Sequence, residues 1–268
     1  MFDIYNYLKI RALKWLKESD YSKYPIRGLW KIKLIFRPNL DERTFNYNVI
    51  LVQTLGQGCC YCNSRSFWSE EKIIGLDSIK ILNEKNCQSI ATLDSIYSSI
   101  PKNPAKIYQF EGNSKEKAEH RTKIILEETE LLLKSINSNK PKILIVGVLG
   151  LLIKRLKERG YLTYATDLDK TLIDRSIHGV TIESGMFTPK YVKECDIAII
   201  TGMTLSTDTL EEIIDHAQKS GTKLLMFAET GAHFGEIYCE LGIDTVISEP
   251  FPFYIFEGIS KIEIYRRR

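Results

Sequence analysis

Short segments in the second half of the chain hold residues that can bind a ligand, and each segment follows an apolar run. Their candidate ligand-binding residues are Gly147, Gly150, Asp167, Thr201, Gly202, Thr204, Glu229, Thr230, Gly231, His233 and Glu249. Glycine lets backbone N–H groups approach a ligand, and a threonine hydroxyl donates or accepts a hydrogen bond. Carboxylates add polar specificity, and a histidine can titrate near neutral pH or bind a metal. A histidine in the first turn of a helix can also simply be exposed to solvent.

The first of these segments contains half of a dinucleotide-binding fingerprint. Gly147 and Gly150 are present, but the full G-x-G-x-x-G pattern is not. Asp167 lies 20 residues beyond Gly147, where an acid that binds a ribose would be placed. The alternative is that the glycines only permit a tight turn and that Asp167 is solvated. A nucleotide is therefore one candidate cofactor.

A cysteine cluster offers a second chemistry. On a strand, Cys60 and Cys62 share one face while Cys59 points to the other. Together with Cys87, or with a ligand from the other half, the pair could bind a soft transition-metal ion. No C-x-x-C pair with partner spacing indicates structural zinc, and buried cysteines often act as small apolar residues.

Alternating strand and helix patterns position the candidate residues. Apolar runs predict strands at 142–147, 161–166, 197–200, 223–227 and 244–247, and helical patterns run to 159 and over 209–220 and 234–241. Parallel strands need crossover helices, so this half predicts a parallel sheet with helices on both faces. Ligands bind such sheets beyond the carboxyl ends of the strands, where the loops converge.

The first half has a different organisation. Strand patterns at 30–36, 47–54 and 58–63 and helical patterns at 87–100 and 115–136 predict a smaller α+β unit. Residues 2–19 form an amphipathic pattern that suits a docking helix or a helix on a membrane surface. We place the boundary near residue 140, which gives domains 1–140 and 141–268.

A rigid aromatic segment follows the last parallel strand. Residues 249–254 contain two prolines, and the bond between Phe251 and Pro252 is a candidate for the cis form. This segment either walls an apolar pocket or forms a buried strap to a final strand at 259–265.

Composition narrows the function classes. The 268 residues are enough for a sizeable core, and the formal net charge of +3 is too small to indicate nucleic-acid binding. No apolar run reaches the roughly 18–20 residues of a membrane span, and the first twenty residues lack a signal-peptide pattern. We therefore expect a cytoplasmic protein without a transmembrane segment. A homodimer is compatible with the sequence, which shows no interface.

The second half resembles a known family. Gly147-Val148-Leu149-Gly150, residues 195–204 and Thr209-Leu210 resemble the Rossmann-like domain of uncharacterised proteins labelled "putative heavy-metal chelation". In that family an N-terminal domain similar to the N-terminal part of enolase precedes the Rossmann-like domain, and residues 89–96 resemble its small-residue helix. The resemblance implies a site in the crevice between the domains. The chain departs from the family at Thr207-Asp208 and at residues 228–230.

The sequence thus predicts an α/β protein with a Rossmann-like parallel sheet and a smaller enolase-N-terminal-like domain. The leading functional hypothesis is binding of a small molecule or metal complex in the crevice, with heavy-metal chelation implied by the resemblance. The alternative is a nucleotide-dependent enzyme, either an adenosyl-cofactor methyltransferase or an NAD-type dehydrogenase.

Overall fold

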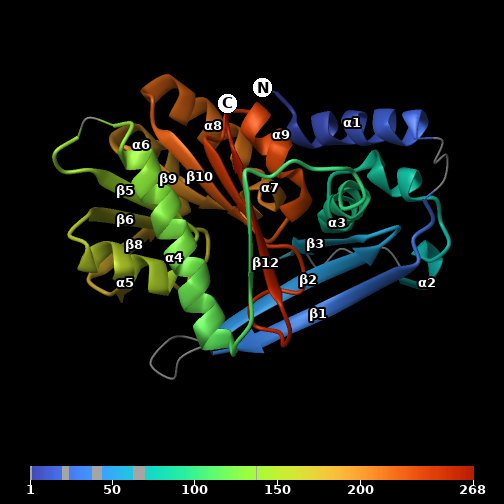
Figure 1. Cartoon of the computed structure of the whole chain (residues 1–268), viewed down its shortest axis with the longest axis horizontal. Coiled ribbons are helices and arrows are strands. Elements are labelled where there is room, and N and C mark those ends of the chain that lie inside the picture. The colour runs from blue at the N-terminus through green and yellow to red at the C-terminus, as the bar shows by residue number, and fades with distance from the viewer. Residues whose placement is uncertain (1, 20–23, 38–43, 63–69, 137) are drawn as a thin grey trace.

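The structure is a computed structural model that describes residues 2–19, 24–37, 44–62, 70–136 and 138–268. Within these residues the chain forms two β-sheets, which lie side by side in Figure 1. The smaller sheet has the order β1-β2-β3 and is antiparallel throughout. Its strands are β1 (Gly28–Phe36), β2 (Phe45–Gln53) and β3 (Gln57–Tyr61). All three agree with the predicted strands, although residue 63 of the third prediction lies outside the described residues.

Helices cover one face of the small sheet. They are α1 (Ile4–Glu18), α2 (Glu70–Ile73), η1 (Ser78–Asn83) and α3 (Cys87–Tyr97). Gly58 allows α3 to lie directly on β3, because a Cβ at this position would be 2.0 Å from the backbone nitrogen of Ser95. The apolar face of α1 is buried, and the Tyr97 hydroxyl of α3 donates to the Leu8 carbonyl at 2.9 Å. The N-terminal amphipathic pattern therefore belongs to a docking helix.

The larger sheet confirms the predicted α/β class. Its strand order is β4-β12-β11-β10-β9-β5-β6-β8-β7. The parallel strands are β5 (Lys142–Val146), β6 (Leu162–Asp167), β8 (Val180–Ser184), β9 (Ile197–Thr201), β10 (Lys223–Ala228) and β11 (Thr245–Ser248). Numbered along the chain, these six have the spatial order 3-2-1-4-5-6, which is the doubly wound nucleotide-fold order. The order in which successive strands are added to the sheet changes direction between β5 and β9.

Antiparallel strands complete both edges of this sheet. They are β4 (Lys106–Phe110), β7 (Ser176–Ile177) and β12 (Ser260–Arg266). Sequence patterns predicted β12 but not β4, β7 or β8. β4 is an edge strand whose residues are exposed or half-buried, so it lacks the apolar run that marks the central strands.

Alternating side chains of the large sheet point into two cores. Ile143 and Ile145 of β5 pack with α4 (Ser114–Leu133) and α5 (Gly150–Glu158), whereas Leu144 packs on the opposite side. That opposite side is covered by α6 (Thr188–Glu194), α8 (Leu210–Ser220) and α9 (Gly235–Glu240). Its core is continuous with the core beneath the small sheet, so the two sheets share buried apolar contacts.

Shorter helical turns join these elements. They are η2 (Gly185–Phe187), α7 (Met203–Ser206) and η3 (Ala232–Phe234). In Figure 1, α4 crosses in front of the large sheet and reaches the end of the small sheet. Both β4 and α4 precede residue 140 yet pack with the large sheet. The division into domains 1–140 and 141–268 stays a prediction.

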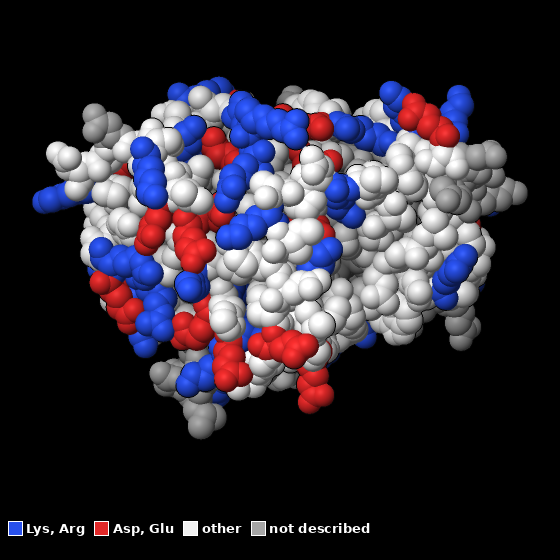
Figure 2. All heavy atoms as spheres, viewed as in Figure 1, with Lys and Arg blue, Asp and Glu red and all other residues white. Residues whose placement is uncertain are grey.

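Charge and hydropathy on the surface are unremarkable for a globular chain. On the face shown in Figure 2, Lys and Arg are interspersed with Asp and Glu. Among the described residues, no helix combines the length and the apolar character needed to cross a bilayer.

Candidate functional site

A cavity of about 610 Å³ lies at the carboxyl ends of the parallel strands. Its floor consists of the loops that follow β5, β6, β9 and β10. Residues of α4 and Tyr254 form a side wall, and residues of all three strands of the small sheet form the roof. The cavity spans the point between β5 and β9 where the strand order reverses, which is where ligands bind in open parallel sheets.

Most of the predicted ligand-binding residues line this cavity. Eight of the eleven do so, namely Gly147, Gly150, Asp167, Thr201, Gly202, Thr204, Glu229 and Thr230. Gly231, His233 and Glu249 are not among the lining residues.

The loop after β5 is held in a conformation that only glycine adopts easily. Gly147 has φ +87°, and its N–H donates to the Thr166 carbonyl at 2.9 Å. A Cβ on this residue would lie 3.0 Å from the hydroxyl oxygen of Thr201. Gly147 therefore lets the first loop approach the end of β9 closely.

The Asp167 carboxylate accepts hydrogen bonds from two neighbouring loops. Its Oδ2 accepts the N–H of Val148 at 2.9 Å, and its Oδ1 accepts the N–H of Asp169 at 2.8 Å. The carboxylate lies at the end of β6, in the position of a ribose-binding acid. A carboxylate has about four lone-pair directions, so both oxygens keep acceptor capacity for a ligand hydroxyl.

The loops after β9 and β10 are in direct contact. Gly202 donates its N–H to the Phe227 carbonyl at 2.8 Å, and a Cβ here would lie 2.5 Å from the Thr230 carbonyl oxygen. The Thr204 hydroxyl donates to the Thr201 carbonyl at 2.8 Å. A residue larger than glycine at position 202 would therefore push the two loops of the cavity floor apart.

A buried arginine joins the wall to the floor. Nη1 of Arg121, on α4, lies 2.9 Å from Oε1 of Glu229 and 3.5 Å from Oε2 of Glu249. The guanidinium also stacks over the ring of Tyr254, with 3.8 Å from Cζ to the centroid. Glu249 lies behind the cavity wall, fully buried, and accepts the Tyr254 N–H at 2.8 Å. One guanidinium thus faces two carboxylates.

These groups perturb one another's ionisation. Burial raises the pKa of Glu249 to about 7 against the opposing effect of Arg121, and burial likewise raises the pKa of Glu229. Burial opposes the charge of Arg121, but Tyr254 and the two carboxylates raise its pKa overall. Burial raises the pKa of Tyr254 to about 12. Near neutral pH this cluster can therefore hold or release a proton, a property that is common at functional sites.

The loop after β10 also anchors the roof. The N–H of Tyr61 donates to the Thr230 hydroxyl at 2.9 Å, and the N–H of Gly231 donates to the Cys59 carbonyl at 3.2 Å. Gly231 has φ +63°, so the chain turns away from the cavity after Thr230. Gly231 thus contributes to docking of the small sheet.

His233 lies beyond that turn, against helix α3, which packs on the small sheet. Its N–H donates to Oδ1 of Asp94 at 2.9 Å, and its Nδ1 is 3.2 Å from the same oxygen. Oδ2 of Asp94 accepts the Cys59 N–H at 2.8 Å. In this structure His233 and buried Asp94 connect the two units.

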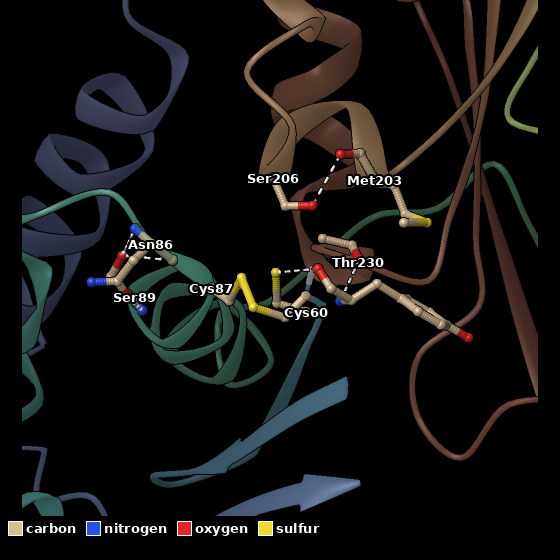
Figure 3. Close-up of a disulfide and its surroundings, with 9 residues drawn as sticks. Cys60, Asn86, Cys87, Ser89, Met203, Ser206 and Thr230 are labelled. Atoms are coloured by element: carbon tan, nitrogen blue, oxygen red, sulfur yellow. Dashed lines mark hydrogen bonds between the residues drawn. A yellow bond between two sulfur atoms is a disulfide. The ribbon is translucent and has the colours of Figure 1, made fainter. Parts of the chain in front are cut away.

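The cysteines predicted as metal ligands are divided between two states. Cys62 forms a disulfide with Cys87, whereas Cys60 keeps a free thiol (Figure 3). A disulfide sulfur is not a thiolate ligand, so Cys60 and Cys62 cannot act as a thiolate pair in this oxidised form. In the part of the chain that the structure describes, no group of three or more His, Cys, Asp or Glu residues is arranged to hold a metal ion.

Sequence reasoning did not find the cavity residues outside the strand ends. Arg121 on α4, Tyr61 on β3 and Tyr254 on the aromatic segment all line the cavity. The aromatic segment gave a partial signal, and its predicted cis bond between Phe251 and Pro252 is confirmed. Arg121 gave none, because a charged residue in a polar helical stretch is normally exposed to solvent.

Comparison with known families agrees with this architecture. The family described as "Putative heavy-metal chelation" matches residues 130–247, a range that contains the floor of the cavity. The chain is therefore similar to that family over this range. The resemblance seen in the sequence is confirmed.

Two solved structures from the putative heavy-metal chelation family share the fold over nearly the whole chain. A protein of unknown function from Pyrococcus horikoshii is 15% identical, with a TM-score of 0.57, and the alignment covers 97% of this chain and 98% of that one. A protein of unknown function from Desulfitobacterium hafniense is 10% identical, with a TM-score of 0.56 and coverage of 90% and 92%. No curated protein matches the chain. These structures confirm the combination of a small antiparallel sheet with a large, mostly parallel one.

Proposed function

We propose that this protein binds a small organic molecule, or a metal complex of one, in the cavity between the two sheets. The observation that supports this proposal is that residues from several loops meet in one cavity. Eight residues, chosen because they lie at or just beyond the ends of four strands of the large sheet, line one cavity of about 610 Å³ that the small sheet covers. This volume is within the range of small-molecule sites, which are concave and combine apolar walls with a few polar groups.

The roof contributes aromatic surface to the cavity, and the floor contributes polar groups. Phe36, Phe45 and Tyr47 contribute aromatic surface from the small sheet, while Thr201 and Glu229 present oxygen atoms from the floor. Such a cavity would bind an aromatic or apolar body through the roof and orient it through the floor.

The family description names heavy-metal chelation, and the lining of this cavity favours a metal complex over a bare ion. The described residues contain no group of three or more side chains suited to hold a metal. A metal bound in this cavity would therefore arrive with ligands of its own, and the chain would recognise the organic part. This reading agrees with the heavy-metal chelation that the family description suggests.

The first test is native mass spectrometry of the protein purified without added ligand, together with elemental analysis for metals. We expect an extra mass that is lost on denaturation. Ala118→Trp, which would fill the cavity from α4, should abolish retention of that mass. Lys115→Trp, on an exposed position of the same helix, should retain it. Thr201→Val, which removes one floor hydroxyl, should weaken retention without a change in fold. Equal retention by all four proteins would place the ligand elsewhere.

A second candidate is a nucleotide-type ligand, and it is favoured by two specific observations. The strand order is that of the dinucleotide fold, and Asp167 lies at the end of the strand next to β5. Thermal-shift measurements with S-adenosylmethionine, NAD⁺ and NADP⁺ test it, because a bound ligand raises the melting temperature. Asp167→Asn should remove the shift for the ligand that binds. No shift with any of the three would set the nucleotide reading aside.

A further inference from the structure

Three sulfur atoms meet on one side of the small sheet. Cys60 lies on β3, Cys62 directly follows that strand, and Cys87 is the first residue of α3. All three pack in the core shared with α3, whereas Cys59 packs in the core on the opposite face. Figure 3 shows the thiol of Cys60 next to the disulfide that joins the other two.

The backbone holds the disulfide-bonded pair independently of the bond itself. The N–H of Cys62 donates to the Asn48 carbonyl at 2.8 Å, which extends the sheet by one residue. Cys87 begins a helix that is fixed by a capping box, in which Asn86 and Ser89 exchange hydrogen bonds of 2.9 Å. The two Cα atoms are 5.7 Å apart. A reduced chain with the same backbone would therefore keep the two thiols facing each other.

The surroundings distinguish the three sulfurs chemically. Cys87 occupies the N-terminus of an 11-residue helix, where the helix dipole favours a negative charge. It is also the most exposed of the three, at 9% against 1% for Cys62. Cys60 takes no part in the disulfide, and its thiol donates to the Tyr61 carbonyl at 3.3 Å.

We propose that Cys62 and Cys87, when reduced, form a two-thiolate site for one Cu⁺ ion. An external dithiol supplies the reduction: its two sulfurs form a new S–S bond, the Cys62–Cys87 bond breaks, and the two protons of the dithiol pass to the cysteine sulfurs. On binding, both thiols release their protons to water, and two thiolates coordinate the ion. Thiolates are the soft ligands that select Cu⁺. The disulfide and the metal-bound form exclude each other, and the site is separate from the cavity proposed above.

The decisive comparison uses the unaltered chain in its two redox states. The oxidised protein and a portion reduced with a dithiol, freed of reductant under nitrogen, are each titrated with Cu⁺ against the chromophoric chelator bicinchoninate. We expect the reduced chain to remove one equivalent of Cu⁺ from the chelator and the oxidised chain to remove none. The free cysteines Cys59, Cys60, Cys195 and Cys239 are present in both states, so they cannot produce the difference.

Variants locate the ion on the two sulfurs. Cys62→Ser and Cys87→Ser should each lose the equivalent bound by the reduced chain. Cys60→Ser and the double variant of Cys195 and Cys239 to serine should keep it. Circular dichroism of the reduced chain tests folding without any substitution. Unfolding on reduction, uptake equal in the two redox states, or uptake that survives Cys87→Ser would each overturn the proposal.

Discussion

Arg121 and Glu229 lie 108 positions apart in the sequence, yet their side chains meet at 2.9 Å in the wall of the cavity. One comes from the middle of α4, the other from the end of β10. Glu249 approaches the same guanidinium nitrogen at 3.5 Å from behind. This arrangement makes the wall depend on a charge whose side chain is only 12% exposed.

Removal of that charge should destabilise the protein strongly. Arg121→Met would leave two carboxylates buried without their partner, and such losses cost about 3–5 kcal/mol. Guanidinium unfolding at neutral pH measures the change in the free energy of unfolding. The matched control is Arg155→Met, which breaks a partly exposed pair with Glu119 and should cost less than about 1 kcal/mol. Similar losses in both variants would contradict the assigned role of Arg121.

Glu249 should make stability depend on pH. Its pKa in the folded chain is raised by burial from 4.5 to about 7, so the folded form holds the proton more tightly than the unfolded form. The contribution to stability is therefore full below about pH 4.5 and is lost as the pH rises through about 7. Glu249→Gln should flatten the decline over this interval, as measured by urea unfolding at a series of pH values. Glu111→Gln, at an exposed position, should follow the wild-type curve.

Substitution of Gly147 should lower the free energy of unfolding by more than backbone strain alone explains. Gly147 and Gly160 have similar positive φ values, +87° and +78°, and alanine at such a position costs roughly 1–2 kcal/mol. A Cβ on Gly160 meets nothing within 4 Å, whereas one on Gly147 presses against Thr201. In chemical unfolding, the loss of stability caused by Gly147→Ala should therefore be larger than that caused by Gly160→Ala by about 1 kcal/mol or more. Equal costs would mean that the loop relaxes without disturbing the end of β9.

Asp94 should be required to hold the small sheet against the loop that follows β10. Asp94→Ala would leave the N–H groups of Cys59 and His233 without their acceptor, at about 1–3 kcal/mol each. His233→Ala removes only the ring contact and should cost about 1 kcal/mol. Hydrogen–deuterium exchange of peptides covering residues 57–61 should accelerate in the first variant and remain nearly unchanged in the second. Unchanged exchange in both would argue against this connection.

Much of the large sheet follows from sequence pattern alone. Parallel strands are buried on both faces and therefore form continuous apolar runs, such as residues 142–146 and 197–200. Loops at the same ends of parallel strands converge. The sequence alone therefore predicts that Gly147, Thr201 and Glu229 lie close together. The same logic fails for strands at an edge, where half-exposed residues such as those of β4 carry no distinctive pattern.

The remaining parts of the candidate site depend on tertiary contacts. Arg121 is buried only because α4 packs over the ends of β9 and β10. His233 follows Thr230 by three positions, but the left-handed turn at Gly231 directs the chain toward α3. Glu249 directly follows β11 at the predicted edge, yet its carboxylate turns to the Tyr254 N–H behind the wall. The position of a residue at the end of a strand predicts which loops it lies near. The direction of its side chain depends on which neighbouring group forms a hydrogen bond or ion pair with it.

The pairing of β4 with β12 has a consequence for biosynthesis. β12 is the last strand of the chain, and its outer neighbour was translated about 150 positions earlier. While the intervening sequence is being made, β4 has no strand beside it, and its backbone hydrogen-bonding groups remain open. The nascent chain therefore completes this ladder only after β12 has been made, and an isolated fragment of residues 141–268 would present β12 as a bare edge prone to self-association.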